Sequence, residues 1–488
     1  MTARAIADAV LAIEARVLHL DWRVNGVDLW PLYRNEVRGR LSIALIGATS
    51  GSRFPHLSQF LDRREQRLPP SDESTVVLLN NGFSRQIVGG RAFDRLCTPL
   101  ATELERSGQR TLLLDQGTPA DSALAPRVRG VGARVRRAKL AGVLKARLGV
   151  DSWTVERCAA LAAAYRAEGI DTAFLPTARD MYARQIAMFD LAMMYEGILR
   201  EQRANLVLQV CFYSVAGYAM NLAAHRVGAP VLDIQHGVID PTHTAYVDWA
   251  PTPAGRALLP DGVWTWSDAE AELVRRGLHL PASQVVAGGH PFVAAWQAGW
   301  LESASEARAD AAAVRSARPD MIHALITLQP GLMTAAALGP LLEAMREAPD
   351  VFWWIRQHPV ELADETSRAL FDQTGAKFDL DLPSSLPLYA ALEQVDIHLT
   401  HSSSTVAEAE AFGVPSLLWS DYGKELFSDA IERGWAVVVV DGGELARAIG
   451  SSDAARPLRV GTEAVDRLLR SLEALRSVVP YQEYRGSV

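Results

Sequence analysis

The sequence predicts an α/β protein with two Rossmann-like domains, each built on a doubly wound parallel sheet. Its 488 residues are too many for one ordinary hydrophobic core, which indicates two or three domains. Short apolar segments alternate with helical segments on both sides of residues 302–319, and this alternation is typical of parallel sheets. No Gly-x-Gly-x-x-Gly or Walker A sequence is present, so simple dinucleotide or P-loop nucleotide binding is not indicated.

The composition is that of a globular protein and carries no overall signal for nucleic acid. Hydrophobic residues make up 49% of the chain and charged residues 22%, and the net charge is −8. The three cysteines lie far apart and form no Cys-x-x-Cys pair, so neither a zinc site nor a disulfide framework is indicated. The N-terminus lacks the apolar block of a signal peptide, and no segment reaches the ~20 apolar residues of a membrane span. We therefore expect a cytoplasmic protein, at most peripheral to the inner face of a membrane.

The first domain is predicted over residues 1–300. Residues 1–70 form an appendage, whose tryptophans are expected to pack it onto the domain rather than to bind a ligand. The loop from Asn80 to Arg85 follows the first strand of the domain, where ligands of parallel sheets bind. It could approach an acceptor, and it could equally be a plain turn. The strands expected here are 75–79, 111–115, 206–210, 230–234 and 263–267.

Residues 127–147 form a basic segment without a single acidic residue. Ala133, Leu140, Leu144 and Leu148 fall on one helical face, which Arg137 interrupts, and glycines weaken the helix prediction. The segment could touch anionic lipid or an anionic acceptor chain, or it could be a solvated basic face. Its basic residues are Arg127, Arg129, Arg134, Arg136, Arg137, Lys139, Lys145 and Arg147.

A linker that is partly helical is predicted over 301–320, and a second domain over 321–488. A helix is expected to begin at Pro340, because proline suits the first position of a helix. The last helix, over 463–477, could pack on either domain. The strands expected in the second domain are 323–328, 351–356, 397–400, 416–419 and 436–440.

Three strand ends of the second domain are expected to converge, because parallel strands end at the same edge of a sheet. They contribute Gln329, the segment 356–359 and the segment 400–404. Hydroxyls, imidazoles, a guanidinium and a helix N-terminus suit a pyrophosphate or phosphodiester, whereas a metal would need clustered carboxylates or more histidines. The alternative is an ordinary helix cap at Ser402–Ser404. Glu408, one turn into the helix, could accept ribose hydroxyls or could simply face solvent.

These motifs resemble the nucleotide-binding half of GT-B glycosyltransferases, over roughly residues 205–450. Arg356-Gln357-His358-Pro359 and Ser402-Ser403-Ser404 are similar to the elements that contact cytidine monophosphate in bacterial capsule and lipopolysaccharide enzymes, the sialyltransferases and Kdo transferases. The run from Ser404 to Glu408 looks like the ribose-binding helix of GT-B enzymes. Gly288-Gly289-His290-Pro291 looks like the Gly-x-Pro element of epimerase-like members. The resemblance implies two facing Rossmann-like domains with a cleft between them. The donor-binding candidates are Gln329, Arg356, His358, Pro359, Ser402, Ser403, Ser404, Thr405 and Glu408.

The catalytic candidate comes from Gln235-His236-Gly237, at a strand end of the first domain. Sialyltransferases usually carry an acidic motif there, whereas the Gln-His-Gly form is similar to capsule-type and teichoic-acid-type polymerases, in which histidine is the candidate base. A neutral imidazole can take a proton from a sugar hydroxyl near pH 7, so His236 is the predicted base, with Asp233 and Asp240 in reserve. His236 could instead be a core histidine. His290 and His401 are weaker candidates, and the acceptor-side set is Asn80, Arg85, Gln235 and Gly237.

The sequence therefore predicts a glycosyltransferase without a resident cofactor or metal. It would move a 2-keto acid sugar, such as Kdo or sialic acid, from a CMP-activated donor to a glycan or lipid-linked acceptor of the cell surface. A CDP-glycerol or CDP-ribitol phosphotransferase, a UDP-sugar GT-B transferase and a non-catalytic nucleotide-sugar-binding module remain as alternatives. No nucleic-acid partner is expected.

Overall fold

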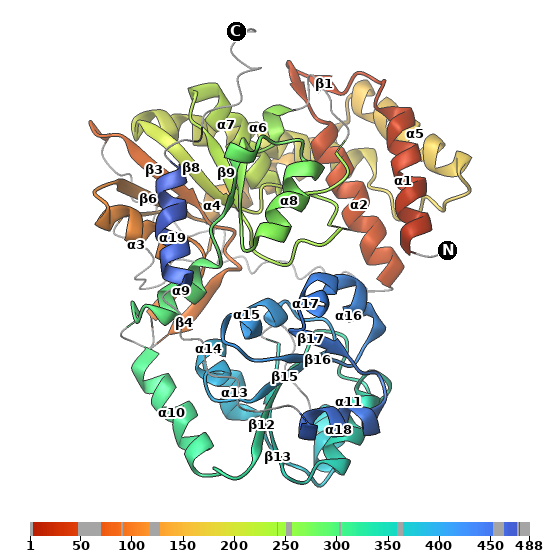
Figure 1. The fold of residues 1–488 in the computed structure, drawn as a ribbon. Coiled ribbons are helices and arrows are strands. Elements are labelled where there is room, and N and C mark those ends of the chain that lie inside the picture. Colours follow the sequence, from red (N-terminus) through yellow and green to blue (C-terminus); the bar gives the residue numbers. More distant parts are fainter. Residues whose placement is uncertain are drawn as a thin grey trace. The chain divides into compact units, whose positions relative to one another are not determined.

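The computed structural model divides the chain into two compact α/β units (Figure 1). The first unit contains residues 1–85, 92–291 and 467–488, and the second contains 86–91 and 292–466. The structure describes residues 3–46, 70–88, 91–117, 127–241, 243–249, 256–301, 304–358, 365–451, 463–475 and 478. Within these ranges, no helix is both long enough and apolar enough to cross a bilayer.

The first unit is built on a seven-stranded parallel sheet with the order β11-β10-β9-β8-β3-β6-β7. Its central strands are almost wholly buried, which explains why they are continuous apolar runs and not alternating patterns. The strands are β3 (Thr75–Leu79), β6 (Arg110–Asp115), β7 (Val128–Gly130), β8 (Ala204–Val210), β9 (Val231–Ile234), β10 (Gly262–Thr265) and β11 (Val285–Ala287). The helices are α3 (Cys97–Arg106), α4 (Gly132–Leu148), α5 (Ser152–Ala167), α6 (Ala178–Glu201), α7 (Val215–Val227) and α8 (Asp268–Gly277), with short 3₁₀ turns η2 (Arg256–Leu258) and η3 (Ala282–Gln284).

The N-terminal appendage packs onto this unit through aromatic side chains, as the sequence predicted. It consists of α1 (Ala3–Val17), a hairpin of β1 (Arg23–Val24) and β2 (Val27–Asp28), and α2 (Trp30–Ile46). Asn25 and Gly26 both have positive φ, as the tight turn of a two-residue hairpin requires. The Trp22 ring lies 4.9 Å from that of Trp30 and 6.4 Å from that of Trp153. The tryptophans therefore anchor the appendage.

The second unit is built on a six-stranded parallel sheet with the order β14-β13-β12-β15-β16-β17. Its core includes Trp353 and Trp354, which are fully buried. The strands are β12 (Ile322–Thr327), β13 (Val351–Arg356), β14 (Lys377–Asp379), β15 (Ile397–Thr400), β16 (Ser416–Leu418) and β17 (Ala436–Val438). The longer helices are α11 (Ala335–Glu347), α12 (Glu365–Asp372) and α18 (Gly442–Ser451); the shorter ones are α13 (Asp381–Ser385), α14 (Leu388–Leu392), α15 (Thr405–Ala411), α16 (Asp421–Leu426) and α17 (Ser428–Glu432).

Residues 301–320, where a partly helical linker was predicted, contain a helix that belongs to the second unit. This helix, α10 (Ser305–Ser316), follows α9 (Pro291–Gln297). Its sequence has no stripe of large apolar residues, and the residue that it buries is the small Ala311. Polar contacts hold it instead. Arg308 forms an ion pair with Glu393 at 3.1 Å and lies over the Trp296 ring, while Arg315 pairs with Asp396 at 2.5 Å. Long arginine side chains thus replace the apolar contacts that a sequence pattern would reveal.

Two other helices differ from the expectation in their start or their position. Helix α11 begins at Ala335, five residues before Pro340, because the Thr334 hydroxyl caps it by accepting from the Ala337 N–H at 3.3 Å. Pro340 therefore lies inside the helix. The last helix, α19 (Glu463–Ala474), belongs to the first unit from Arg467 onward. The Arg467 guanidinium lies 3.7 Å from the Asp268 carboxylate of α8.

Candidate functional site

The carboxyl ends of three neighbouring strands lie together in the second sheet. Thr327, the last residue of β12, pairs with Arg356 of β13 on one side and with Thr400 of β15 on the other. Because all three strands are parallel, the residues that follow them emerge at one edge of the sheet. The structure thus brings together the three segments that the sequence predicted to converge.

Gln329 and the serine turn contact each other directly. The Gln329 side-chain oxygen accepts hydrogen bonds from the Ser402 N–H at 2.9 Å and from the Ser402 hydroxyl at 3.0 Å. The Ser403 N–H donates to the Thr400 hydroxyl at 3.1 Å, and the Ser403 hydroxyl lies 3.0 Å from that of Thr405. These contacts fix the turn, while Ser402 and Ser403 stay half-buried and Ser404 is exposed.

The serine turn does only part of the capping that an ordinary N-cap would do. Ser404 is the N-cap residue of α15, but its side chain makes no capping hydrogen bond. The Ser403 hydroxyl accepts from the Thr405 N–H at 3.3 Å instead. The exposed Ser404 hydroxyl is therefore not committed to the helix. Helix α15 has only seven residues, so its dipole adds less than the sequence suggested.

Arg356 braces a neighbouring turn. Its guanidinium donates to the backbone carbonyls of Pro383 and Leu386, and the Gln357 N–H donates to the Ser384 hydroxyl at 3.1 Å. His358 lies just beyond β13 and is half-buried, whereas Pro359 lies outside the described residues. In this structure Arg356 shapes the edge of the site, and a contact with a donor stays a prediction.

Glu408 is buried, which excludes the interpretation that it faces solvent. It is 4% exposed, and its carboxylate accepts from the Tyr389 hydroxyl at 2.8 Å. Glu408 lies on the first turn of α15, four residues beyond Ser404. A buried carboxylate beside a hydroxyl-lined turn is a strong acceptor for sugar hydroxyls, because hydrogen bonds to charged groups exceed neutral ones in strength.

A buried histidine beneath the turn was not predicted as part of the site. His398 lies in the middle of the sheet, with Nε2 at 2.9 Å from the Thr327 hydroxyl and Nδ1 at 2.9 Å from the Ser416 hydroxyl. Complete burial lowers the pKa of His398 to about 3, so the imidazole is neutral. It links three strands below the serine turn. The sequence signal for this role of His398 was a lone histidine within an apolar strand. At the surface of the turn, His401 lies 2.9 Å from the Ser402 hydroxyl through its Nδ1.

In the first sheet, Asn80 and Arg85 are tied to the end of β6. The Asn80 amide, fully buried, donates to Asp115 at 2.8 Å, and its oxygen accepts from the Gln116 N–H at 2.9 Å. The Arg85 guanidinium donates to the same carboxylate of Asp115. Both predicted acceptor-side residues therefore serve as internal braces, and Asn80 can affect an acceptor only through the loop that it holds.

The Gln235 side chain likewise makes structural hydrogen bonds within the protein. Its side chain is fully buried, donates to the Gly237 carbonyl at 2.9 Å and to the Glu270 carboxylate, and accepts from the Trp266 N–H at 2.7 Å. These bonds tie the end of β9 to the start of α8. Gln235 therefore fixes the position of His236 and cannot itself reach an acceptor, whereas Gly237 stays partly exposed.

Asp233 and His236 occupy different environments although they are only three residues apart. Asp233 is fully buried and accepts from the Phe212 N–H at 2.7 Å and from the Tyr246 hydroxyl at 2.5 Å. Burial raises the pKa of Asp233 to about 7. His236 is partly exposed, its Nε2 lies 3.1 Å from the Tyr213 hydroxyl, and burial lowers its pKa to about 4. Asp233 thus cannot reach an acceptor in this conformation, whereas His236 is neutral at pH 7.

Three aromatic residues around His236 were missed by the sequence prediction. Tyr213 lies 5.7 Å from both His236 and His243, ring centre to ring centre, and Tyr246 lies 4.8 Å from His243. They come from the loops after β8 and β9. Further along the edge, His290 stacks on Trp266 at 4.5 Å, and burial lowers its pKa to about 3. The positive charge of Arg95 also lowers the pKa values of His236 and His290.

The N-terminal appendage holds the loops that carry these aromatic residues. Asn35 of α2 donates to the Tyr213 carbonyl at 2.9 Å. Arg34, 1% exposed, donates to the carbonyls of Val247 at 3.1 Å and Asp248 at 3.0 Å, and pairs with Glu14 at 3.0 Å. The appendage is therefore part of the support of the site and not a separate module.

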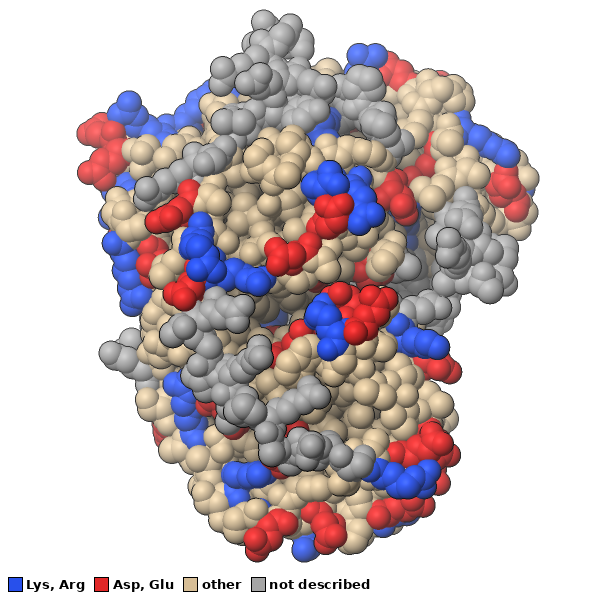
Figure 2. Space-filling model, viewed as in Figure 1, with Lys and Arg blue, Asp and Glu red and all other residues tan. Residues whose placement is uncertain are grey.

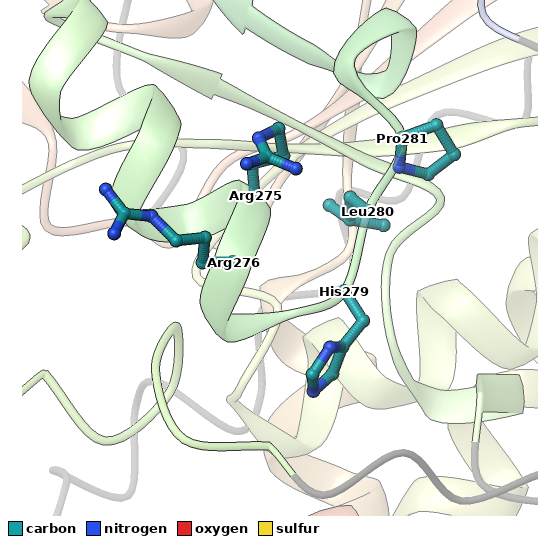
Figure 3. Close-up of a pocket in the computed structure, with 5 residues that line it drawn as sticks. All are labelled: Arg275, Arg276, His279, Leu280 and Pro281. Atoms are coloured by element: carbon teal, nitrogen blue, oxygen red, sulfur yellow. The ribbon is translucent and has the colours of Figure 1, made fainter.

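A hollow of about 560 Å³ lies elsewhere on the first unit (Figure 3). Its lining residues Arg275 and Arg276 come from the last turn of α8, and His279, Leu280 and Pro281 follow that helix. Both arginines pair with Glu272, and His279 Nε2 lies 2.6 Å from the Trp249 carbonyl. Since α8 connects β10 to β11, its C-terminus lies at the amino edge of the sheet, away from the residues above.

Known structures share this architecture. UDP-GlcNAc 2-epimerase from Methanocaldococcus jannaschii aligns over 82% of this chain and 99% of its own, with 12% identity and a TM-score of 0.51. A Listeria monocytogenes structure with the provisional name UDP-N-acetylglucosamine 2-epimerase aligns over 84% and 100%, with 12% identity and a TM-score of 0.50. No protein-family model and no curated protein matches the sequence. At this identity the likeness concerns the fold: the chain consists of two Rossmann-like units of GT-B type.

Proposed function

We propose that this chain is a glycosyltransferase that uses a CMP-activated sugar. The observation that carries the proposal is the edge of the second sheet, where Gln329, the serine turn and Glu408 follow strands that are adjacent and in register. Hydroxyls and amides there suit a phosphate, and the buried carboxylate of Glu408 suits the hydroxyls of a ribose. The second unit would bind the donor nucleotide.

The first unit would position the acceptor and supply the base. His236 is neutral at pH 7 and partly exposed, and it directly follows Gln235, whose side chain is held by buried hydrogen bonds. Its Nε2 would take the proton of an acceptor hydroxyl. The hydroxyl oxygen would bond to the anomeric carbon while the bond from that carbon to the phosphate oxygen breaks, and CMP would leave with both bonding electrons.

The donor sugar and the acceptor follow from the resemblance of the motifs. We propose a 2-keto acid sugar such as Kdo or sialic acid as the transferred group, and a glycan or lipid-linked acceptor at the cytoplasmic side of a membrane. Arg356, His358 and Thr405 would complete the donor site around Ser402–Ser404. The reaction is proposed to need no metal, since hydroxyls and amide donors would stabilise the leaving phosphate.

A transfer assay with His236→Ala tests this proposal, because removal of a general base costs typically 10²–10⁴-fold in rate. The matched control is His279→Ala, which removes an imidazole from the hollow at the amino edge of the first sheet. Full activity of His236→Ala would contradict the assigned base. Activity abolished by a chelator and restored by a divalent ion would contradict the metal-free reaction.

The nature of the product separates the remaining alternatives. Transfer of a polyol phosphate from CDP-glycerol or CDP-ribitol would show attack at phosphorus in place of carbon. Turnover of UDP-GlcNAc, by transfer or by epimerisation, would replace CMP as the donor nucleotide. Nucleotide binding without turnover of any donor would indicate a binding module.

A further inference from the structure

Helix α4 has one face that is fixed against the first unit. Val135, Gly142 and Ala146 are buried on this face. Gly142 lies so close to α6 that a Cβ atom would come within 2.3 Å of the Ala183 carbonyl oxygen. The glycine that weakened the helix prediction is thus needed where the two helices cross. This close contact fixes which residues α4 turns outward.

The opposite face of α4 presents large apolar side chains to solvent. Leu140 is 46% exposed, Val143 42%, Leu144 51% and Leu148 91%. The three leucines are spaced four residues apart, so they form a stripe along the helix. Ala133, which the sequence grouped with this stripe, is buried. A run of four exposed apolar residues on one helix indicates an interaction surface.

The same outward face is basic. At 100° per residue, Arg136, Arg137 and Arg147 lie within about 60° of Leu140 around the helix axis. Residues 127–150 contain no acidic residue. This differs from the face shown in Figure 2, on which acidic and basic side chains are interspersed. Within α4 itself, the apolar stripe is therefore flanked by basic side chains and by no acidic one.

Five basic residues of the predicted segment do not belong to this surface. Arg134 and Lys145 lie more than 100° from Leu140 around the helix axis, and the Lys145 amine lies 3.9 Å from the Asp190 carboxylate of α6. Arg127 pairs with Glu105 at 2.7 Å, and Arg129 is buried and pairs with Glu201 at 3.5 Å. Lys139 lies about 100° from Leu140 around the helix axis, on the side of the buried Val135, and burial lowers the pKa of its amine. The surface is thus narrower than the sequence suggested, and it consists of Leu140, Val143, Leu144 and Leu148 with Arg136, Arg137 and Arg147.

We propose that this face of α4 binds the surface of an anionic lipid bilayer. The leucines and Val143 would enter the boundary between headgroups and acyl chains, and the arginines would contact lipid phosphates. Apolar and basic side chains intermixed on one helix match the layered chemistry of that boundary. A nucleic acid would use the arginines but would leave the leucines without a partner. The proposal does not depend on transferase activity.

Co-sedimentation of the full chain with vesicles tests this proposal. The vesicles consist of phosphatidylcholine alone or of an equal mixture with phosphatidylglycerol, at low and at high salt. We expect binding to the anionic vesicles only, and weaker binding at high salt. Leu140→Ser/Leu144→Ser/Leu148→Ser should reduce the partition coefficient at least tenfold, because the inserted apolar area is lost. Arg137→Gln/Arg147→Gln should reduce it roughly 25-fold, since each charge contributes about fivefold.

Matched controls keep the result interpretable. Arg275→Gln/Arg276→Gln makes the same change of charge on α8 and should leave binding unchanged. Leu148→Ser alone alters a side chain that is 91% exposed, so it cannot disturb the core, and it should still weaken binding. Unchanged thermal melting of each variant shows that the fold is retained.

Several results would overturn the proposal. Failure to bind anionic vesicles would do so directly. Equal binding by wild type and the leucine variant, with competition by duplex DNA, would identify a polyanion surface. A dimer that dissociates in the leucine variant, measured by sedimentation velocity, would identify a second copy of the chain as the partner.

Discussion

Both sheets end in polar side chains at their carboxyl edges, but the two edges use these side chains differently. In the first unit, Asn80, Asp233 and Gln235 are fully buried, and protein groups satisfy them. In the second unit, Ser402 and Ser403 are half-buried and Ser404 is exposed around Gln329. The carboxyl edge of the first sheet thus consists mainly of internally bonded polar groups beside partly exposed imidazoles such as His236 and His290, whereas that of the second sheet presents the half-buried and exposed hydroxyls of the serine turn.

This difference shows that a polar residue at a strand end is not by itself a ligand. A buried polar group must find a partner within the protein, because leaving it unsatisfied costs free energy. Gln235 does so through Glu270 and Trp266, and it thereby fixes His236. Burial and bonding thus distinguish Gln235 from the half-buried and exposed serines of the second sheet, which sequence position alone does not.

The largest expected effect concerns the N-terminal appendage, which supports the loops at the carboxyl edge of the first sheet. Arg34→Ala should destabilise the first unit by about 3–5 kcal/mol, because it leaves Glu14 with one partner fewer and releases the Val247 and Asp248 carbonyls. Calorimetry that resolves the transitions of the two units measures this.

The control for Arg34 lies in the same appendage. Arg16→Ala removes a partly exposed ion pair with Glu168 and should cost about 0–1 kcal/mol. An equal loss in both variants would contradict the view that the appendage supports the first edge through Arg34.

A smaller effect is expected at the carboxyl edge of the second sheet, where Glu408 lies. Glu408→Gln should weaken nucleotide binding about tenfold to hundredfold, since a hydrogen bond to a charged acceptor contributes about 1.5–3 kcal/mol. Glutamine can still accept from Tyr389, so the fold should be retained. Titration calorimetry measures the affinity.

Glu410→Gln is the matched control for Glu408, two residues further along α15. Glu410 pairs with Arg433 at 2.7 Å and is not a predicted ligand. The account predicts unchanged nucleotide affinity for this variant. If both variants lost affinity equally, Glu408 would not be a specific contact.

The smallest effect, when counted for each pH unit, concerns acid sensitivity. Burial lowers the pKa of His398 to about 3, whereas the unfolded imidazole has a pKa near 6.5. In this pH range the unfolded state therefore binds a proton that the folded state does not bind. The free energy of unfolding falls as the pH drops from about 6.5 toward 3. His398→Gln should reduce this slope in the second unit by about 1.4 kcal/mol per pH unit.

Urea unfolding at several pH values measures the slope. In the first unit, His236 and His290 act in the same direction as His398. Asp233 acts in the opposite direction, because its pKa is raised to about 7 and the folded state takes up a proton as the pH falls. Identical slopes for wild type and His398→Gln would contradict the assignment of a neutral buried imidazole.

The sequence predicted the two-sheet architecture and the meeting of Gln329 with the serine turn, because the order of parallel strands follows from general rules. It could not predict the contacts of Arg34 with residues 247 and 248, which are more than 200 positions away. Tyr213, His243 and Tyr246 were missed for the same reason, since irregular loops carry no periodic pattern. The contacts of α10 within the second unit were not predicted either, because arginine side chains make them and no apolar stripe marks them in the sequence.

The central claim is that the second edge binds the nucleotide of a CMP-linked donor. Thermal unfolding of the full chain with CMP, CDP, UDP and GDP tests it most directly. CMP at a hundredfold excess over its Kd should stabilise the second unit by about 2.7 kcal/mol, and at the same CMP concentration Glu408→Gln should reduce this stabilisation to about 0.4–1.4 kcal/mol. Stabilisation by UDP with no effect of CMP, or no effect of any nucleotide, would contradict it.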